Sequence, residues 1–456
     1  MNSTSRTLQK SSAPLNDKSD KFYRRLPRYR LLATTVVLLT IAVCSVEQMW
    51  YVHWGGDPRV FVHAARLMLA GQDLIAIPTV SGLYYVYPPF FAFLNIPLVF
   101  LPIGFVIVLW TIASVILLGW SMAAFYAGMT EQTFYSIPAR TRWIVFTITL
   151  LLTARFIFFH LQGGQSNIFV LALAVLGLRL MSRKQDIRAG VSIGLSIILK
   201  ITTLPFVFWF LARQKVKVIV GICLGGLVGI LLPAVVVGLK TDFYYHREWF
   251  DKVFRTNAII SGIPSGIGNL SLRAQLGRFF QAVPTFEYHR RAYQFTLVEL
   301  SPRVIMLLGW LLVLAISFAI VAYAVRYRNR SRLVSEWGGY ALVFSLIPSF
   351  STWTEVHHLV LLVPAYLYVV HLWHSRLVTD RLFKLLVVFS FIFLTLTSKM
   401  FCGVFLSGVL TSLGFINYGL LLLSASIFRA ASCLQVLETA ESRELMPVSD
   451  HLLPVT

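Results

Sequence analysis

One carboxylate stands directly after the first long apolar run, in the segment Trp54-Gly55-Gly56-Asp57-Pro58-Arg59. Two glycines before Asp57 and a proline after it predict a tight, well-defined turn. A carboxyl group that is partly buried near a lipid boundary has a raised pKa and can act as a general base. In the alternative interpretation Asp57 only caps the helix that follows, as its N-cap residue. The residues alone leave both roles open.

A second chemical feature is the histidine pair His357 and His358, which follows Trp353 at the start of a later apolar run. An imidazole that faces the bundle can donate a hydrogen bond to an anion, and Lys200 can add a positive charge. The alternative is that the pair only anchors its helix at the membrane interface. No further His or Cys lies at ligand spacing, so we expect neither a metal site nor a cofactor.

Three other polar segments interrupt the apolar runs. Tyr85-Val86-Tyr87-Pro88-Pro89 marks the point at which the chain re-enters the lipid. Gly163-Gly164-Gln165-Ser166-Asn167 opens a helix, and the amides of Gln165 and Asn167 either bind substrate hydroxyls or hold neighbouring helices together. Asn269-Leu270-Ser271-Leu272-Arg273 lies in the longest polar loop, where its Asn-x-Ser triplet is a weak signal of any modification.

Composition fixes the class of protein that must position these residues. The chain has 456 residues, of which 57% are hydrophobic and only 13% are charged, and its mean hydropathy is +0.73. A soluble protein is about a quarter charged. Because apolar runs of roughly 20 residues match the hydrocarbon core of a bilayer, we predict an all-α, multi-pass membrane protein.

The net charge of +21 does not indicate a nucleic-acid partner, because its basic residues cluster in short segments beside apolar runs. Such clusters mark the cytoplasmic side of a membrane. The N-terminus is then cytoplasmic, and residues 51–85 face outward. We predict a basic cytoplasmic segment over 1–30, a transmembrane domain over 31–429 and a cytoplasmic tail over 430–456. The clusters are Lys21, Arg24, Arg25, Arg28 and Arg30; Arg179, Arg183, Lys184 and Arg188; Arg213, Lys215 and Lys217; and Arg326, Arg328, Arg330 and Arg332.

Not every apolar run can cross the membrane. Counting each as a span gives about thirteen, whereas two cytoplasmic termini need an even number, so we expect about twelve. We expect that the polar region Arg155–Asn167 fails to cross fully. Residues 60–69 predict an amphipathic helix on the membrane surface. Residues 189–211 have basic clusters at both ends, which predicts two short helices that meet at Lys200 near the outer surface.

With this topology the polar segments converge on the outer face. There the chain resembles glycosyltransferase family 87 of the GT-C superfamily, which includes polyprenol-phosphate-mannose-dependent mannosyltransferases. The resemblance runs from the first span to about residue 365. It is carried by Gly56-Asp57, Tyr87-Pro88-Pro89-Phe90, Gly164-Gln165-Ser166-Asn167, Gly194 to Lys200 before Pro205, Asn269-Leu270-Ser271-Leu272-Arg273 and the segment from Trp353 to His358.

The resemblance implies transfer of a sugar, with mannose expected, from a polyprenyl-phosphate donor to a hydroxyl of a glycolipid or glycan. The reaction would take place on the extracytoplasmic face of the cell membrane with inversion at the anomeric carbon. Asp57 maps to the family's base, and His357 or His358 maps to the histidine that contacts the donor phosphate. We expect Lys200 and Arg273 to join that histidine, and we expect substrate contacts from Tyr87, Gln165, Asn167, Asn269 and Trp353.

The segment Pro348–His358 departs from the family pattern, which has a small residue and a proline before the tryptophan and a single histidine. Which histidine acts therefore stays open, and Glu355 could be a second acid. Two further function classes compete with a glycosyltransferase. A transporter or lipid-linked glycan flippase more often shows an internal repeat and mid-span charges. A glycan ligase or polymerase would have a larger outer domain than residues 239–302.

Overall fold

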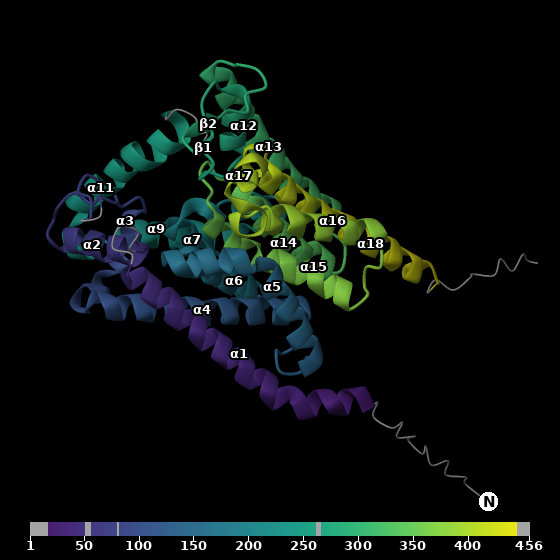
Figure 1. Ribbon diagram of the computed structural model, residues 1–456. Coiled ribbons are helices and arrows are strands. Elements are labelled where there is room, and N and C mark those ends of the chain that lie inside the picture. Colours follow the sequence, from purple (N-terminus) through teal and green to yellow (C-terminus); the bar gives the residue numbers. More distant parts are fainter. Residues whose placement is uncertain (1–16, 51–55, 80–81, 261–265, 445–456) are drawn as a thin grey trace, which may run out of the picture. The chain divides into compact units, whose positions relative to one another are not determined.

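The computed structural model is almost entirely helical (Figure 1). It describes residues 17–50, 56–79, 82–260 and 266–444. The first half contains α1 (Asp17–Trp50), α2 (Asp57–Leu69), α3 (Pro89–Leu94), η1 (Ile96–Phe100), α4 (Ile103–Met129), α5 (Ala139–Gly163), α6 (Asn167–Ser182), α7 (Asp186–Leu199), η2 (Ile201–Thr203), α8 (Pro205–Ala212), α9 (Val216–Leu231), α10 (Ala234–Val237), α11 (Leu239–Glu248) and η3 (Trp249–Ile260).

The second half begins with a small outer region and continues as helices. It contains α12 (Leu272–Phe280), β1 (Phe286–Tyr288), β2 (Arg291–Tyr293), α13 (Pro302–Arg326), η4 (Leu333–Gly338), α14 (Gly339–Phe350), η5 (Val356–Leu362), α15 (Val363–His374), α16 (Arg381–Phe391), η6 (Ile392–Leu396), α17 (Lys399–Ser412) and α18 (Phe415–Glu444). The two strands pair antiparallel, with Phe286 opposite Tyr293.

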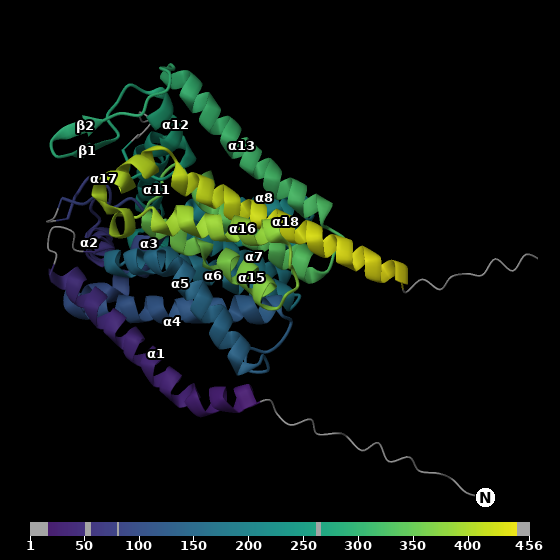
Figure 2. The same cartoon turned by 45° about the vertical axis from the view of Figure 1, so that its right-hand side comes forward.

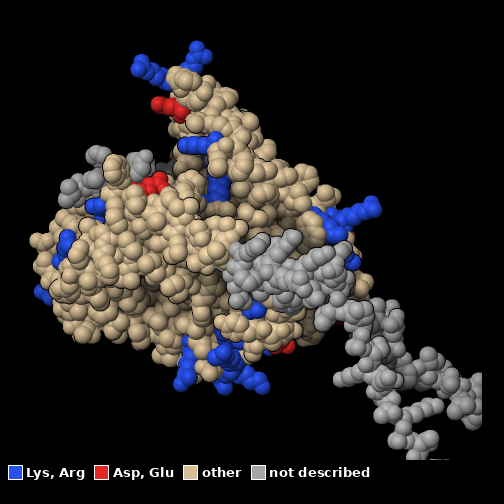
Figure 3. Space-filling view, turned by 60° about the horizontal axis from the view of Figure 1, so that its bottom comes forward, with Lys and Arg blue, Asp and Glu red and all other residues tan. Residues whose placement is uncertain are grey.

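The chain divides after Val43 into two compact units, and the larger, Cys44–Thr456, contains all elements from α2 onward. Its core is formed by α14 and by the consecutive helices η5 and α15, whose side chains are almost all buried. Helices α16 and α18 pack side by side, as both ribbon views show (Figures 1 and 2). Much of the surface in Figure 3 carries no charged side chain, as expected of a protein surrounded by lipid.

The predicted all-α class is confirmed apart from the small hairpin, but the count of about twelve spans is not. Among the described residues, seven helical segments are long and apolar enough to cross a membrane, and an eighth appears if the pair Arg381–Leu396 and Lys399–Ser412, bent by 87°, is one span. The seven are Leu31–Trp50, Ile103–Met129, Ala139–Gly163, Val216–Val237, Pro302–Arg326, Val356–His374 and Phe415–Thr439. Several other apolar runs fold as helices too short for this count.

The region Arg155–Asn167 joins a candidate span, α5, to α6, whose 16 residues are too few for the span count. Arg155 lies inside α5, which is continuous for 25 residues up to Gly163. The run over residues 86–101 is the one that breaks up, into α3 with six residues and η1 with five. Prolines explain the difference, because Pro88, Pro89 and Pro97 divide that run, whereas α5 contains none.

The predicted break at Lys200 is confirmed. Helix α7 ends at Leu199, and Lys200 adopts an extended conformation with φ −157° and ψ 117°. The short turn η2 follows, and Pro205 then begins α8. Lys200 is thereby placed at the junction of two short helices, where its side chain is not confined within a continuous helix.

Helix α2 contains the predicted amphipathic segment, but its apolar side is covered by protein. Eight of its thirteen residues are buried, and the helix packs against α3, η1 and α4. Contact within the protein therefore explains the apolar face that we assigned to lipid.

The predicted domain boundaries do not coincide with the ends of helices. Helix α1 starts at Asp17, before residue 30, and α18 continues past residue 429 to Glu444.

Candidate active site

Asp57 is the first residue of α2, and Gly56 occupies the N-cap position. The hypothesis that Asp57 serves as the N-cap residue is therefore wrong. Its Oδ2 instead accepts a hydrogen bond of 3.0 Å from the hydroxyl of Tyr87, thirty residues further along the chain. The carboxylate thus points at another polar segment, as a reactive group would.

A close approach of two backbones holds Asp57 in place. Gly164 ends α5 in the left-handed region at φ +61°, and a Cβ there would lie 2.5 Å from Cδ of Pro58. Only glycine fits this position without strain. The turn that carries Gln165 can therefore pack directly against the start of α2, which brings two predicted site segments together.

Tyr87, Gln165 and Lys200 surround the carboxylate. The Tyr87 hydroxyl lies 3.4 Å from Oε1 of Gln165, and the Lys200 ammonium lies over the Tyr87 ring, 5.2 Å from its centroid. Tyr87 itself is fixed by aromatic contacts with Phe61 and Phe91. Burial and the Asp57 charge raise the pKa of Tyr87 well above its ordinary value, so the phenol keeps its proton and donates it.

Burial raises the pKa of Asp57 to about 6, although the Lys200 ammonium and the Tyr87 hydrogen bond act in the opposite direction. Burial also lowers the pKa of Lys200, against the pull of the Asp57 and Glu355 carboxylates. A carboxyl group with a pKa near 6 is ionised at neutral pH and is a much stronger base than an exposed aspartate.

The histidine pair sits on a turn organised by Glu355. Glu355 is the N-cap of η5; its carboxylate accepts from the His358 backbone, while its own N–H donates to Nδ1 of His358 at 2.8 Å. Glu355 also accepts from the Trp353 indole at 2.8 Å and lies 3.5 Å from Nδ1 of His357. The Glu355 carboxylate is occupied by these contacts, which stabilise the turn. This argues against Glu355 as a second catalytic acid.

The same bonds settle the tautomer of His358. Because its Nδ1 accepts the Glu355 N–H, its own proton resides on Nε2. The hydrogen-bond donor of the His358 ring is thus its Nε2–H group. His357 is fixed differently, through its carbonyl, which accepts from the Asn167 side chain at 3.3 Å.

Asn269 braces the histidine turn from the other side. Its amide donates to the carbonyl of Thr352 at 3.2 Å, and its Oδ1 accepts the backbone N–H groups of Ser271 and Thr354, both at 3.0 Å. Arg278 in turn donates to the Asn269 carbonyl at 2.8 Å. Asn269 therefore positions residues 352–354 through their backbone.

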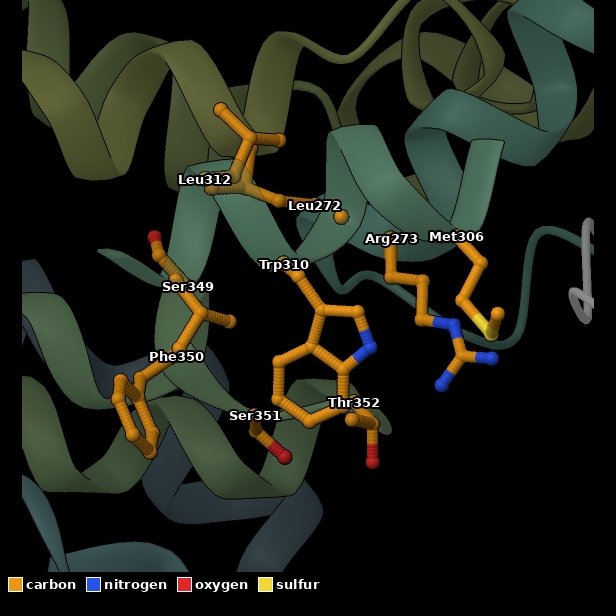
Figure 4. Close-up of a pocket in the computed structure, with 11 residues that line it drawn as sticks. Leu272, Arg273, Met306, Trp310, Leu312, Ser349, Phe350, Ser351 and Thr352 are labelled. Carbon is orange, nitrogen blue, oxygen red and sulfur yellow. The ribbon is translucent and has the colours of Figure 1, made fainter. Parts of the chain in front are cut away.

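Arg273 lines an open pocket beside the same turn, and Asp57 is not among the residues that line it. Figure 4 shows the Trp310 indole in the middle of this pocket, with Arg273 and Phe350 to either side. Met306, Ser351 and Thr352 also line it. Trp353 is 44% exposed and contributes its indole N–H to Glu355.

The structure thus gathers Asp57, Tyr87, Gln165 and Lys200 with the Glu355 turn, while Asn269, Arg273 and Trp353 stand around that turn. Trp54 and Gly55 of the first motif lie outside the described residues. In the part of the chain that is described, no group of three or more His, Cys, Asp or Glu side chains could hold a metal ion.

His160, a fully buried residue in the last turns of α5, is a further residue of this region that we did not predict from the sequence. Lys200 acts electrostatically on His160, and His160 on both His357 and His358, so it belongs to the same neighbourhood. A histidine inside the apolar run Phe156-Ile157-Phe158-Phe159-His160 was the available signal, because ionisable residues are rare in membrane helices unless they function.

Comparison with known proteins identifies one family. The sequence model of glycosyltransferase family 87 matches residues 85–348, more than half of the chain. Tyr87, Gln165, Asn167, Lys200, Asn269 and Arg273 fall within the match, whereas Asp57 and the histidine pair flank it. No curated protein and no solved structure matches this chain.

Proposed function

Because this chain belongs to glycosyltransferase family 87, and is a membrane glycosyltransferase, we propose that Asp57 is its general base. The reaction is transfer of a sugar, mannose in the first instance, from a polyprenyl-phosphate donor to a hydroxyl of a glycolipid or glycan. It takes place at the extracytoplasmic face of the cell membrane. The observation that carries the proposal is the raised-pKa Asp57 carboxylate, bonded to Tyr87 and placed beside Lys200.

The chemistry needs one base on the acceptor side. As the acceptor oxygen bonds to the anomeric carbon, its proton passes to Asp57. The bond from that carbon to the phosphate oxygen breaks, and its electron pair leaves with the polyprenyl phosphate. Attack opposite the leaving group inverts the anomeric centre. Tyr87 and Gln165 hold the carboxylate in line for this step.

The leaving group gains one negative charge as the bond breaks, so donors aimed at it stabilise the transition state. His358 fits this task best, because its Nε2–H is preset by the backbone bond at Nδ1. Lys200 adds a positive charge between the base and the imidazoles. The hydrogen bond that the Asn167 side chain donates to the His357 carbonyl holds the histidine turn against the start of α6.

The remaining predicted residues support binding of the lipid donor. The pocket lined by Arg273, Met306 and Trp310 combines a guanidinium with an apolar wall, which suits an amphiphilic phosphate. Asn269 and Trp353 act on the substrate through the histidine turn that they brace.

The test of the base is Asp57→Asn, assayed in purified protein with polyprenyl-phosphate mannose. We expect transfer to fall by at least about 100-fold, because an amide cannot take the proton, while donor binding persists. Asp73→Asn is the matched control, because the contacts of Asp73 lie in the loop after α2 and with α11 and η3: it accepts from the Ile75 and Ala76 N–H groups and from the Tyr244 hydroxyl, and it lies 3.7 Å from Nζ of Lys252. Retained transfer in Asp57→Asn would remove Asp57 from the mechanism.

The test of the donor compares polyprenyl-phosphate mannose, polyprenyl-phosphate glucose and GDP-mannose as sole sugar sources. Transfer from the first alone is the expected result, and NMR of the product should show inversion. Transfer from GDP-mannose without lipid phosphate would overturn the lipid-donor proposal.

A further inference from the structure

His160 has a buried imidazole ring that no hydrogen bond within the described residues accounts for. Its side chain is 0% exposed, and neither Nδ1 nor Nε2 has a hydrogen-bond partner there. Leaving both nitrogens unpaired costs about 1–3 kcal/mol for each buried group. A phenylalanine, like the two residues before it, would fill the same space without that cost.

Its surroundings are rich in hydrogen-bond donors. Helix α5 packs against η5, which carries His357 and His358. Lys200 acts on all three imidazoles. The imidazole rings of His160, His357 and His358 and the Lys200 ammonium therefore lie on one side of the site. Among the described residues, these histidines are not part of a group that could hold a metal ion.

The start of α6 adds to this donor-rich face. His160 accepts the backbone N–H of Gln165 through its carbonyl, so its backbone adjoins the turn that begins the helix. Asn167, the first residue of α6, is buried, and its Oδ1 also lacks a partner in the described structure. The N-terminus of this sixteen-residue helix, with the positive end of its dipole, lies at this turn.

We propose that His160 is a phosphate ligand of this enzyme, donating a ring N–H to the donor phosphate together with Lys200 and His358. The inference rests on the proposed function and deepens it. In the transfer step the phosphate diester becomes a monoester, and the new negative charge resides on its oxygens. An N–H that meets those oxygens binds the transition state and the product more strongly than the donor.

The critical variant is His160→Phe, which preserves ring volume and removes both nitrogens. We expect kcat to fall about 10- to 100-fold with little change in KM, since the bond strengthens as charge develops. A binding measurement separates this role from a structural one: His160→Phe should bind farnesyl phosphate about tenfold more weakly and farnesol as tightly as the wild type does.

The matched control is His371→Phe, which removes an imidazole of α15 that bonds Tyr126 rather than the site. It should leave both affinities unchanged. If His160→Phe does not fold, His160→Gln retains an N–H donor and should bind farnesyl phosphate better than His160→Ala does.

Two outcomes are distinguishable. If the wild type binds farnesyl phosphate and His160→Phe or His160→Ala binds it equally well, the role of His160 is overturned. The proposed function would still stand in that case. Absence of farnesyl phosphate binding and of lipid-donor transfer in the wild type would overturn the proposed function itself.

Discussion

Asp57 and Lys200 illustrate how two buried charged groups set one another's protonation. Burial alone would drive both towards their neutral forms, and each charge limits that effect on the other. Tyr87 joins them, since it donates to the carboxylate and presents its ring to the ammonium. The outcome is a carboxylate that is ionised yet basic at neutral pH.

The pH dependence of transfer follows from this arrangement. The folded-state pKa of Asp57, about 6, lies above its ordinary value, so the base is active above that pH and is lost as pH falls through it. We expect kcat/KM, which reports the pKa of the free enzyme, to fall tenfold per pH unit well below pH 6. A rate that stays constant down to pH 4 would contradict the assignment.

Lys200→Met adds a second readout. Removing the ammonium takes away the main charge that favours ionised Asp57, so the pKa of Asp57 should rise further and the acid limb should move to higher pH. The measurement is the pH profile of kcat/KM in the variant against the wild type. If the acid limb of the pH profile does not shift and only the plateau value of the profile falls, Lys200 acts on the phosphate alone.

The histidines should differ in effect. Because the His358 side chain both accepts the N–H of the N-cap residue Glu355 and presents Nε2–H, His358→Ala should reduce kcat more than His357→Ala does. His358→Asn supplies a matched comparison with a shorter donor. A larger loss in His357→Ala would assign the phosphate contact to the other ring.

At the scale of elements, Lys200 is positioned by the packing of α7 on α9. Cβ atoms at Gly190 and Gly221 would lie 2.1 Å and 2.2 Å from backbone oxygens of the facing helix. The same close approach recurs at Gly194 and Gly225. Small residues let membrane helices approach this closely, and the pair then sets the point at which α7 breaks.

Two neighbouring glycines on α9 test this packing. A Cβ at Gly225 would lie 2.4 Å from the Val191 carbonyl oxygen, whereas a Cβ at Gly226 meets nothing within 4 Å. Gly225→Ala should therefore destabilise the protein by about 1–3 kcal/mol and lower transfer, while Gly226→Ala should be neutral or stabilising. Thermal unfolding in detergent measures both, and equal effects would contradict the packing argument.

At the scale of the whole molecule, the site is assembled at one set of helix ends. Asp57 begins α2, Gln165 lies between α5 and α6, Lys200 directly follows α7, and Glu355 lies between α14 and η5. Basic residues occur at the opposite ends, in the segments after α6, α8 and α13. If the basic ends are cytoplasmic, as such clusters usually are, we predict that the site faces outward.

Cysteine labelling tests this orientation after replacement of Cys44, Cys223, Cys402 and Cys433. Glu287→Cys, on the exposed side of β1, should react with a membrane-impermeant maleimide in intact cells. Arg183→Cys, between α6 and α7, should react only after permeabilisation. The reverse pattern would place the site on the cytoplasmic face.

The sequence by itself determined the helical membrane class, the break at Lys200 and the helix that opens at Asn167. These follow from local causes: apolar runs of bilayer length, a lysine that lipid disfavours, and a glycine pair before a helix. It also singled out Asp57 and the histidine pair as the polar groups worth testing, because polar side chains are costly at membrane depth.

Only the tertiary structure decided what each of these groups touches. The Asp57–Tyr87 bond, the use of Glu355 and Asn269 as braces, and the unpaired ring of His160 depend on segments far apart in the sequence. The count of about twelve full spans is likewise not confirmed, because hydropathy does not distinguish lipid from a covering of neighbouring helices. Apolar residues on short helices such as α2 and α14 are buried by protein, and no single segment of sequence records its neighbours.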